Sequence, residues 1–163
     1  MINTLVLTSN SIRHQYFALR MSNEFNVLDV LSEPKKNYFT KSRQASSLVA
    51  EHFQQLGNAE RDVFKNAINF RTDFKVFDDI NSPRAVAYAK LLSPDVICLF
   101  GTSILNEAWL SAFPGRIVNL HLGLSPFYRG SATLFWPFYF QELECLGTTI
   151  HLAVAKLDAG NIL

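Results

Sequence analysis

Three polar side chains in this sequence have the types needed to move a proton and to stabilise a negatively charged oxygen. Asn119 and His121 are two residues apart, behind the apolar pair Ile117 and Val118, and Asp158 lies further along the chain. On a β-strand this spacing puts both side chains on one face. An amide can donate to a developing oxyanion, an imidazole exchanges protons near neutral pH, and a carboxylate can orient the imidazole. The pattern predicts a compact site for acid–base and oxyanion chemistry.

The segment after His121 predicts where this site opens. Residues 122–131 are rich in glycine, proline and serine, so we expect the strand to end at His121 and a loop to begin there. In α/β sheets, ligands bind in the crevice outside the carboxyl ends of the strands. We therefore expect Asn119 and His121 at the ligand-binding edge of a sheet.

Short apolar runs alternate with helical patterns along the chain. We expect strands at residues 4–8, 26–31, 74–77, 95–100, 117–121 and 148–154. We expect helices at residues 12–24, 40–70 with an interruption at Gly57 and Asn58, 82–92, 106–113 and 132–141. This alternation predicts an α/β fold with a mostly parallel sheet.

The composition indicates one globular domain spanning residues 1–163, with 48% apolar and 18% charged residues. The net charge of +1, without a region dense in lysine or arginine, disfavours nucleic acid as a partner. No apolar run approaches the roughly 20 residues of a membrane span, so we expect no membrane insertion. Only two cysteines are present, Cys98 lies within an apolar run, and no secretory segment precedes the domain. These features predict a cytoplasmic protein.

Two classes of cofactor are disfavoured by the sequence. No G-x-G-x-x-G motif follows the first predicted strand, so we expect neither a nicotinamide nor a flavin. The four histidines share no metal-ligand spacing with one another or with the cysteines, and we expect no metal ion; they are His14, His52, His121 and His151.

The polar residues belong to an ordered set of motifs that resembles the signature of the folate-dependent formyltransferases. That family reads approximately N-x-H-P-S-L-L-P-x-Y-R-G, then G-x-T-x-H, then L-D-x-G-x-I. The matching positions are Asn119, His121, Pro126, Tyr128, Arg129, Gly130, Gly147, Thr149, His151, Leu157, Asp158, Gly160 and Ile162. Residues 94–105 also resemble the strand and folate loop of the family, and the resemblance covers most of the chain.

The resemblance implies a fold, a reaction and a set of roles. It implies a Rossmann-like domain with helices on both faces of the sheet, and catalysis by Asn119, His121 and Asp158. The implied formyl donor is 10-formyltetrahydrofolate, which transfers its formyl group to a primary amine without a metal ion. The implied pocket for the pterin ring is lined by the loop of residues 102–105 and by residues 153–158, with Leu110 as an apolar wall. The predicted donor-binding residues are Thr102, Ser103, Ile104, Leu105, Leu110, Val154 and Leu157.

The identity of the acceptor amine rests on departures from the family pattern. Leu122, Gly123 and Ser125 replace a proline, a serine and a leucine in the loop. Residues 8–14 also depart from the glycine-rich phosphate loop of glycinamide ribonucleotide transformylase. We therefore expect an amino sugar, linked to a nucleotide, as the acceptor.

Three further residues are predicted to contact the substrate, each with a structural alternative. Arg129 can bind a phosphate or carboxylate, or it can brace the loop. Ser9 and Asn10 can hold an anion at a helix N-terminus, or they can cap that helix. His151 is expected to be structural, and Trp136 belongs to an aromatic stretch expected in the core or at an interface.

A second interpretation is a folate- or nucleotide-binding module that has lost catalysis, or a fragment of a longer formyltransferase. In the family the L-D-x-G-x-I segment is followed by more strand and helix. Here only residues 161–163 remain after Gly160. A shortened sheet would expose apolar surface, which a homodimer would cover. Folate binding without turnover would favour this interpretation.

Overall fold

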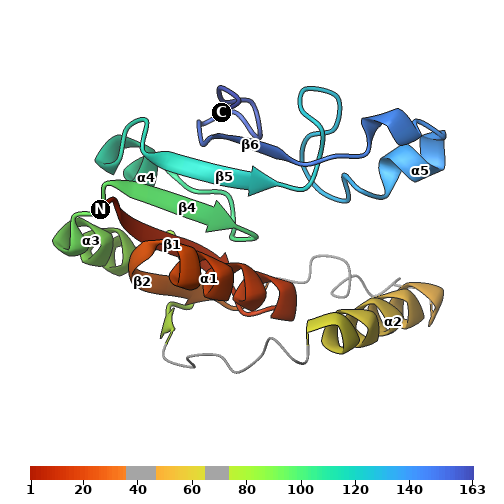
Figure 1. The fold of residues 1–163 in the computed structure, drawn as a ribbon, viewed down its shortest axis with the longest axis horizontal. Coiled ribbons are helices and arrows are strands. Elements are labelled where there is room, and N and C mark those ends of the chain that lie inside the picture. Colours follow the sequence, from red (N-terminus) through yellow and green to blue (C-terminus); the bar gives the residue numbers. More distant parts are fainter. Residues whose placement is uncertain (36–46, 65–73) are drawn as a thin grey trace.

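The computed structural model describes residues 1–35, 47–64 and 74–163. Within these residues six strands form one sheet in the order β3-β2-β1-β4-β5-β6 (Figure 1). The strands are β1 (Asn3–Ser9), β2 (Asn26–Glu33), β3 (Lys75–Val76), β4 (Val96–Phe100), β5 (Ile117–His121) and β6 (Thr149–Leu152). The prediction of an α/β fold with a mostly parallel sheet is confirmed.

The pairing of the strands places the carboxyl ends of β1, β4 and β5 along one edge. All neighbouring strands are parallel except β5 and β6, which are antiparallel. Leu99 of β4 pairs with Asn119 of β5, and Asn119 pairs with His151 of β6. The antiparallel strand therefore brings a histidine from a distant part of the sequence next to Asn119.

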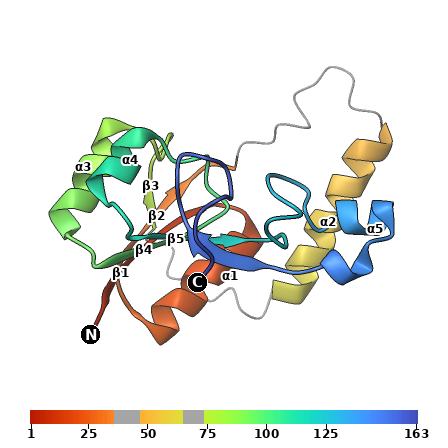
Figure 2. The same ribbon diagram turned by 90° about the horizontal axis from the view of Figure 1, so that it is seen from above.

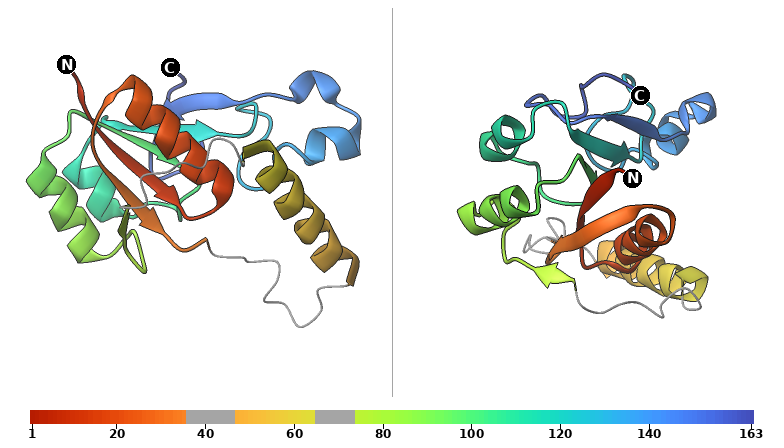
Figure 3. Two further views of the ribbon diagram at one scale, coloured as in Figure 1. Left: turned by 60° about the horizontal axis from the view of Figure 1, so that its bottom comes forward. Right: turned by 60° about the vertical axis from the view of Figure 1, so that its left-hand side comes forward.

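Helices cover both faces of the sheet, as predicted. They are α1 (Ile12–Glu24), α2 (Ser47–Phe64), α3 (Pro83–Leu92), α4 (Glu107–Ala112) and α5 (Trp136–Phe140), with a short 3₁₀ turn, η2 (Leu143–Cys145). α3 and α4 lie on one face, and α1 lies on the other with α2 beside it (Figure 3). The larger core cluster is on the α3/α4 face and includes Leu7, Ile97 and Trp109, whereas on the other face Val6 packs against Ala18 of α1.

β2 extends beyond its predicted end at residue 31. Ser32 and Glu33 pair with Thr8 and Ser9 of β1, and both are buried. The Glu33 carboxylate accepts the backbone N–H of Ile80 at 3.2 Å, so its burial is compensated by hydrogen bonding. The predicted end of this strand at residue 31 is therefore wrong, and the strand includes Ser32 and Glu33.

Two helix predictions also differ from the structure. α2 runs through Gly57 and Asn58 without the predicted interruption, and the remainder of the 40–70 prediction lies outside the described residues. α5 begins at Trp136 and not at residue 132. Ala132 has a left-handed φ of 57°, and the Thr133 hydroxyl donates to the Leu122 carbonyl, so these residues hold the preceding loop instead of a helical turn.

The aromatic residues of α5 are exposed, which excludes the core but not the interface among the two predicted placements. Trp136 is 40% exposed and Tyr139 is 65% exposed, and both rings contact other aromatic rings of the same helix. α5 projects beyond the sheet at the end where the β5–β6 connection turns back (Figures 1 and 2). No helix in the described part of the chain is long and apolar enough to cross a membrane.

Candidate active site

Asn119 lies at the centre of a cluster of polar side chains at the end of β5. Its Nδ2 donates to Asp158 Oδ1 at 3.2 Å and lies 3.1 Å from His151 Nε2. β5 supplies Asn119, the neighbouring strand β6 supplies His151, and the turn after β6 supplies Asp158. The structure therefore brings together groups that are far apart in the sequence.

His121 is held between two oxygen acceptors. Its Nδ1 lies 3.4 Å from Asp158 Oδ2, and its Nε2 lies 2.8 Å from the main-chain oxygen of Tyr128. The side chains of His121 and Asp158 are 6% and 8% exposed. This geometry satisfies both ring nitrogens when each carries a hydrogen, as in an imidazolium facing a carboxylate.

Asp158 uses both carboxylate oxygens within the cluster. Oδ1 accepts from Asn119 and lies 3.5 Å from His151 Nε2, whereas Oδ2 faces His121 and accepts the backbone N–H of Gly130 at 2.9 Å. Asp158 has a left-handed φ of 44°, which is uncommon for a residue with a side chain. Two residues later, Gly160 lies so close to the Leu152 carbonyl that no Cβ fits. The backbone of this turn thus aims the carboxylate at the end of β5.

His151 was expected to be structural, but the structure places it within the cluster. Its Nδ1 lies 2.8 Å from the carbonyl of Leu152, and a carbonyl only accepts, so Nδ1 carries the hydrogen. In the neutral ring, Nε2 then accepts from the Asn119 amide. His151 therefore orients Asn119. The antiparallel pairing of β5 with β6 is the signal that would have identified it, because the pairing puts the two residues opposite each other.

The predicted donor-binding loop is anchored by two polar side chains. Glu33 accepts the backbone N–H of Ser103, and the Asn81 amide donates to the Ile104 carbonyl at 2.9 Å. The Thr102 hydroxyl donates to the Ser103 carbonyl. These contacts fix the loop backbone, but they also occupy some of the main-chain groups that were predicted to contact the pterin.

Apolar side chains connect this loop with the segment after β6. Leu105 is buried in the larger core cluster, and Leu110 and Ala153 pack against that cluster. Val154 and Leu157 are each 45% exposed. These residues therefore combine packing against the larger core cluster with exposed apolar surface at Val154 and Leu157.

The loop after β1 is filled by a histidine of the protein itself. Ser9 is fully buried, and its hydroxyl lies 2.5 Å from His14 Nδ1, while the Ser11 hydroxyl lies 2.6 Å from the same atom. The ring packs against Gly101, whose φ of 76° and close approach leave no room for a Cβ. Burial lowers the pKa of His14 to about 3, and the charges of Lys35 and Arg13 add to this effect. His14 is therefore neutral near pH 7.

The Ser9 side chain is buried against His14 and does not lie in the polar cluster around Asn119. Asn10 is exposed, but its side-chain oxygen accepts the N–H of Lys35 at 2.9 Å, and its own N–H donates to the Glu33 carbonyl. Arg129 is exposed and precedes Gly130, which contacts Asp158. Of the three residues predicted to contact the substrate, Arg129 is the one adjacent in sequence to a residue that contacts the polar cluster, Gly130.

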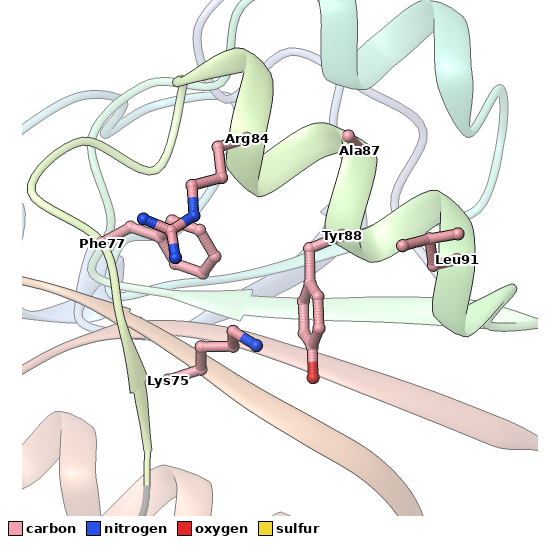
Figure 4. A pocket seen from close by; sticks show the side chains of 6 residues that line it. All are labelled: Lys75, Phe77, Arg84, Ala87, Tyr88 and Leu91. Atoms are coloured by element: carbon pink, nitrogen blue, oxygen red, sulfur yellow. The ribbon is translucent and has the colours of Figure 1, made fainter.

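A surface pocket of about 230 Å³ lies on a different part of the molecule, between β3 and α3 (Figure 4). Lys75 Nζ lies 3.6 Å from the centre of the Tyr88 ring, and the Tyr88 hydroxyl donates to Asp29 at 2.7 Å. The residues that line it are Lys75, Phe77, Arg84, Ala87, Tyr88 and Leu91, and none of them is a predicted site residue.

No group of histidine, cysteine, aspartate and glutamate side chains in residues 1–35, 47–64 and 74–163 is arranged to hold a metal ion.

A family model described as formyl transferase matches residues 2–163. The chain belongs to the formyl transferase family. The resemblance carried by the motifs around Asn119 and Asp158 is thereby confirmed at the level of the family.

Solved structures support the same fold. Glycinamide ribonucleotide transformylase 1 from Symbiobacterium toebii is 22% identical with a TM-score of 0.62, over 100% of this chain and 71% of that one. Phosphoribosylglycinamide formyltransferase from Streptococcus pneumoniae TIGR4 is 23% identical with a TM-score of 0.63, over 100% and 79%. A formyltetrahydrofolate deformylase from Pseudomonas syringae pv. tomato str. DC3000 is 18% identical with a TM-score of 0.54, over 99% and 49%. At these identities the similarity establishes the formyltransferase fold.

Proposed function

We propose that this protein transfers a formyl group from 10-formyltetrahydrofolate to the primary amine of a small acceptor. Membership of the formyl transferase family supports the reaction class. The observation that most strongly supports the mechanism is the convergence of Asn119, His121 and Asp158. An amide donor, an imidazole and a carboxylate are the groups that this reaction requires.

In the proposed reaction, the amine nitrogen forms a bond to the formyl carbon, and the bond between that carbon and the folate nitrogen breaks. Asn119 donates an N–H to the formyl oxygen while it carries negative charge. Because both nitrogens of His121 already face oxygen acceptors, the proton that the amine loses passes through a water molecule to Asp158 and is then delivered to the leaving nitrogen. Asp158 also orients the imidazole through Nδ1.

When Asn119 donates to the formyl oxygen, it gives up one of the hydrogen bonds that its amide makes within the cluster. Its Nδ2 donates to Asp158 and faces His151, so both amide hydrogens have acceptors within the protein. The formyl oxygen gains charge as the reaction proceeds and becomes a stronger acceptor than the imidazole. The exchange therefore favours the transition state over the bound substrate.

We assign the donor's pterin ring to the loop of residues 102–105 and to residues 153–158. Glu33 and Asn81 hold the backbone of the first segment, which reduces the cost of ordering it on binding. Leu105 and Leu110 supply apolar contact, and Val154 and Leu157 have exposed surface to offer from the other side.

We propose a nucleotide-linked amino sugar as the acceptor. The loop after β1 supports this choice over an acceptor with a terminal phosphate, because His14 fills the space beneath it and Asn10 is bonded within the protein. A phosphate at a helix N-terminus needs free backbone N–H groups and space. Arg129 is exposed beside the loop that contacts Asp158 and is available for a diphosphate.

A panel of amines tests this proposal. Purified protein is incubated with 10-formyltetrahydrofolate and, in turn, with nucleotide-linked amino sugars, the corresponding free amino sugars, and glycinamide ribonucleotide, and the products are identified by mass spectrometry. We expect formylation of a nucleotide-linked amino sugar. Turnover of glycinamide ribonucleotide alone would overturn the choice of acceptor and leave the reaction class in place.

Calorimetry of folate binding separates the enzyme from a binding module. The resemblance to longer chains motivates this second candidate, because the described fold spans 71% and 79% of two of its structural relatives. Binding of a folate analogue without turnover of any amine would favour the module. Absence of both binding and turnover would contradict the proposed function.

A further inference from the structure

Gly123, two residues after His121, occupies a position where no side chain fits. A Cβ added there would lie 2.5 Å from His121 Nε2, 2.6 Å from the Tyr128 oxygen and 2.7 Å from Thr133 Cβ. Gly123 is buried, and the resembling family signature has a serine at this position. The close approach of the loop to His121 is thus a property of this chain's own sequence.

The atoms that a side chain at Gly123 would displace form a hydrogen bond. His121 Nε2 donates to the main-chain oxygen of Tyr128 at 2.8 Å, and since a carbonyl only accepts, Nε2 carries a hydrogen. Nδ1 then faces Asp158 Oδ2. A half-turn of the ring would place carbon atoms opposite both oxygens, so the two acceptors select one ring orientation.

The Tyr128 carbonyl is held in place from both sides of the loop. The Tyr128 N–H donates to the Leu124 carbonyl at 2.9 Å, and its hydroxyl donates to Glu142. Thr149 Oγ1 donates to the Gly123 carbonyl at 2.7 Å and accepts the N–H of Ser125. The missing Cβ would lie 2.5 Å from the His121 ring and 2.6 Å from the tethered Tyr128 oxygen, so a larger residue would have to push the ring and the carbonyl out of their present contact.

We propose that Gly123 is a positioning residue for His121: by lacking a side chain it admits the Tyr128 carbonyl, which holds the imidazole with its hydrogen on Nε2 and Nδ1 toward Asp158. The kinetic consequence rests on the proposed formyl transfer, whereas the geometric one does not. The residue acts through His121 and does not itself contact the reacting atoms.

Heteronuclear NMR of the imidazole nitrogens tests the geometry without any substrate. The His121 signals are assigned by their disappearance in His121→Gln. We expect Nε2 of the native protein to carry a hydrogen that exchanges slowly with water, and Gly123→Ala to shift the Nε2 signal and speed its exchange. The control is Gly147→Ala, whose Cβ would lie 3.3 Å from the flexible Leu124 side chain and should leave the His121 signals unchanged.

Kinetics test the consequence for the reaction. In Gly123→Ala and Gly123→Ser we expect kcat to fall by about tenfold to a hundredfold, with a smaller change in KM for the donor and an altered pH profile, because a misplaced catalytic group loses orientation. Gly147→Ala should retain native kinetics.

The two readouts separate the possible failures. A His121 Nε2 without hydrogen in the native protein, or unchanged His121 signals in a folded Gly123→Ala, would overturn the proposal. If Gly123→Ala does not fold, the measurement on the native protein still decides the position of the hydrogen. Native protein that formylates no amine would overturn the proposed function and leave the NMR result standing.

Discussion

His14 and His121 are both buried imidazoles near the carboxyl edge of the sheet, but their neighbours differ. His14 is surrounded by two serine hydroxyls, the Phe100 ring and the charges of Lys35 and Arg13. His121 faces a carboxylate and a carbonyl. Burial and nearby positive charge keep the first ring neutral, whereas two oxygen acceptors suit a ring that carries hydrogen on both nitrogens.

The difference teaches that burial alone does not identify a reactive histidine. Both rings are excluded from water, and each approaches a glycine where no Cβ fits, Gly101 for His14 and Gly123 for His121. What distinguishes them is the charge of the partner. We therefore expect changes around His121 to affect the reaction and changes around His14 to affect stability.

The largest effect is expected from removing the carboxylate. Asp158→Asn should lower formyl transfer by about a thousandfold or more, because the reaction loses its proton acceptor and His121 loses the group that orients it. Asparagine tolerates the left-handed φ of 44°, so the backbone should persist. The measurement is kcat/KM. The control is Asp95→Asn, a carboxylate that accepts the Asn3 N–H far from the site, and equal rates in both variants would refute the mechanism.

A somewhat smaller effect is expected at the oxyanion donor. Asn119→Ala should lower kcat by about a hundredfold to a thousandfold, the range for loss of one oxyanion donor, with donor binding largely retained. Steady-state kinetics give kcat, and calorimetry gives the donor affinity. An effect confined to donor affinity would show that Asn119 binds the donor and does not stabilise the transition state.

On the His14 side, the first test is steric and concerns stability. Gly101→Ala and Gly115→Ala both place alanine at a positive φ, 76° and 68°, but only the first Cβ would meet another group, the His14 ring. We expect Gly101→Ala to lower the free energy of unfolding by about 2 kcal/mol more than Gly115→Ala, the scale of overpacking in a core. Chemical denaturation measures the difference, and equal losses would show that His14 adapts freely.

The smallest effect is a dependence of stability on pH. The pKa of His14 in the folded protein is about 3, below its ordinary value of 6.5, so between these values the unfolded chain binds a proton that the folded protein does not. This contribution to stability is present above pH 6.5 and is lost as the pH falls toward 3. From pH 6 to pH 5 it amounts to about 1 kcal/mol.

The matched variant for this test is His14→Phe, which keeps an aromatic ring beside Phe100. We expect urea denaturation to give a flatter dependence on pH in the variant than in the native protein. Measurements at pH 8, where His14 is neutral in both states, isolate the change in packing. An identical slope in the two proteins would show that His14 does not titrate as described.

The strands that carry the site were predicted well because their sequences are apolar and short. β5 begins and ends where predicted, and the spacing of Asn119 and His121 on it follows from strand geometry. The extension of β2 was missed because Ser32 and Glu33 resemble a turn until the backbone N–H groups that satisfy the buried carboxylate are known. Such partners are distant in sequence.

The membership of the polar cluster was harder to predict. His151 enters it through an antiparallel pairing at the sheet edge, and a single sequence gives little information about which strands pair. The expected substrate contact at Ser9 depended on the loop after β1 being open, and the structure fills that loop with His14. In both cases the local sequence was compatible with either outcome, and tertiary contacts decided it.

The turn that carries Asp158 also affects how the motif should be read in related sequences. Gly160 is required by its approach to the Leu152 carbonyl, whereas Asp158 is required by the groups at the end of β5. In the L-D-x-G segment the glycine therefore permits the shape of the turn, and the proposed mechanism gives the aspartate the chemical role. A homologue that keeps the glycine but has lost the aspartate should retain the turn as a folded scaffold without the transfer chemistry, and recombinant production of such a homologue would separate inheritance of the fold from inheritance of the reaction.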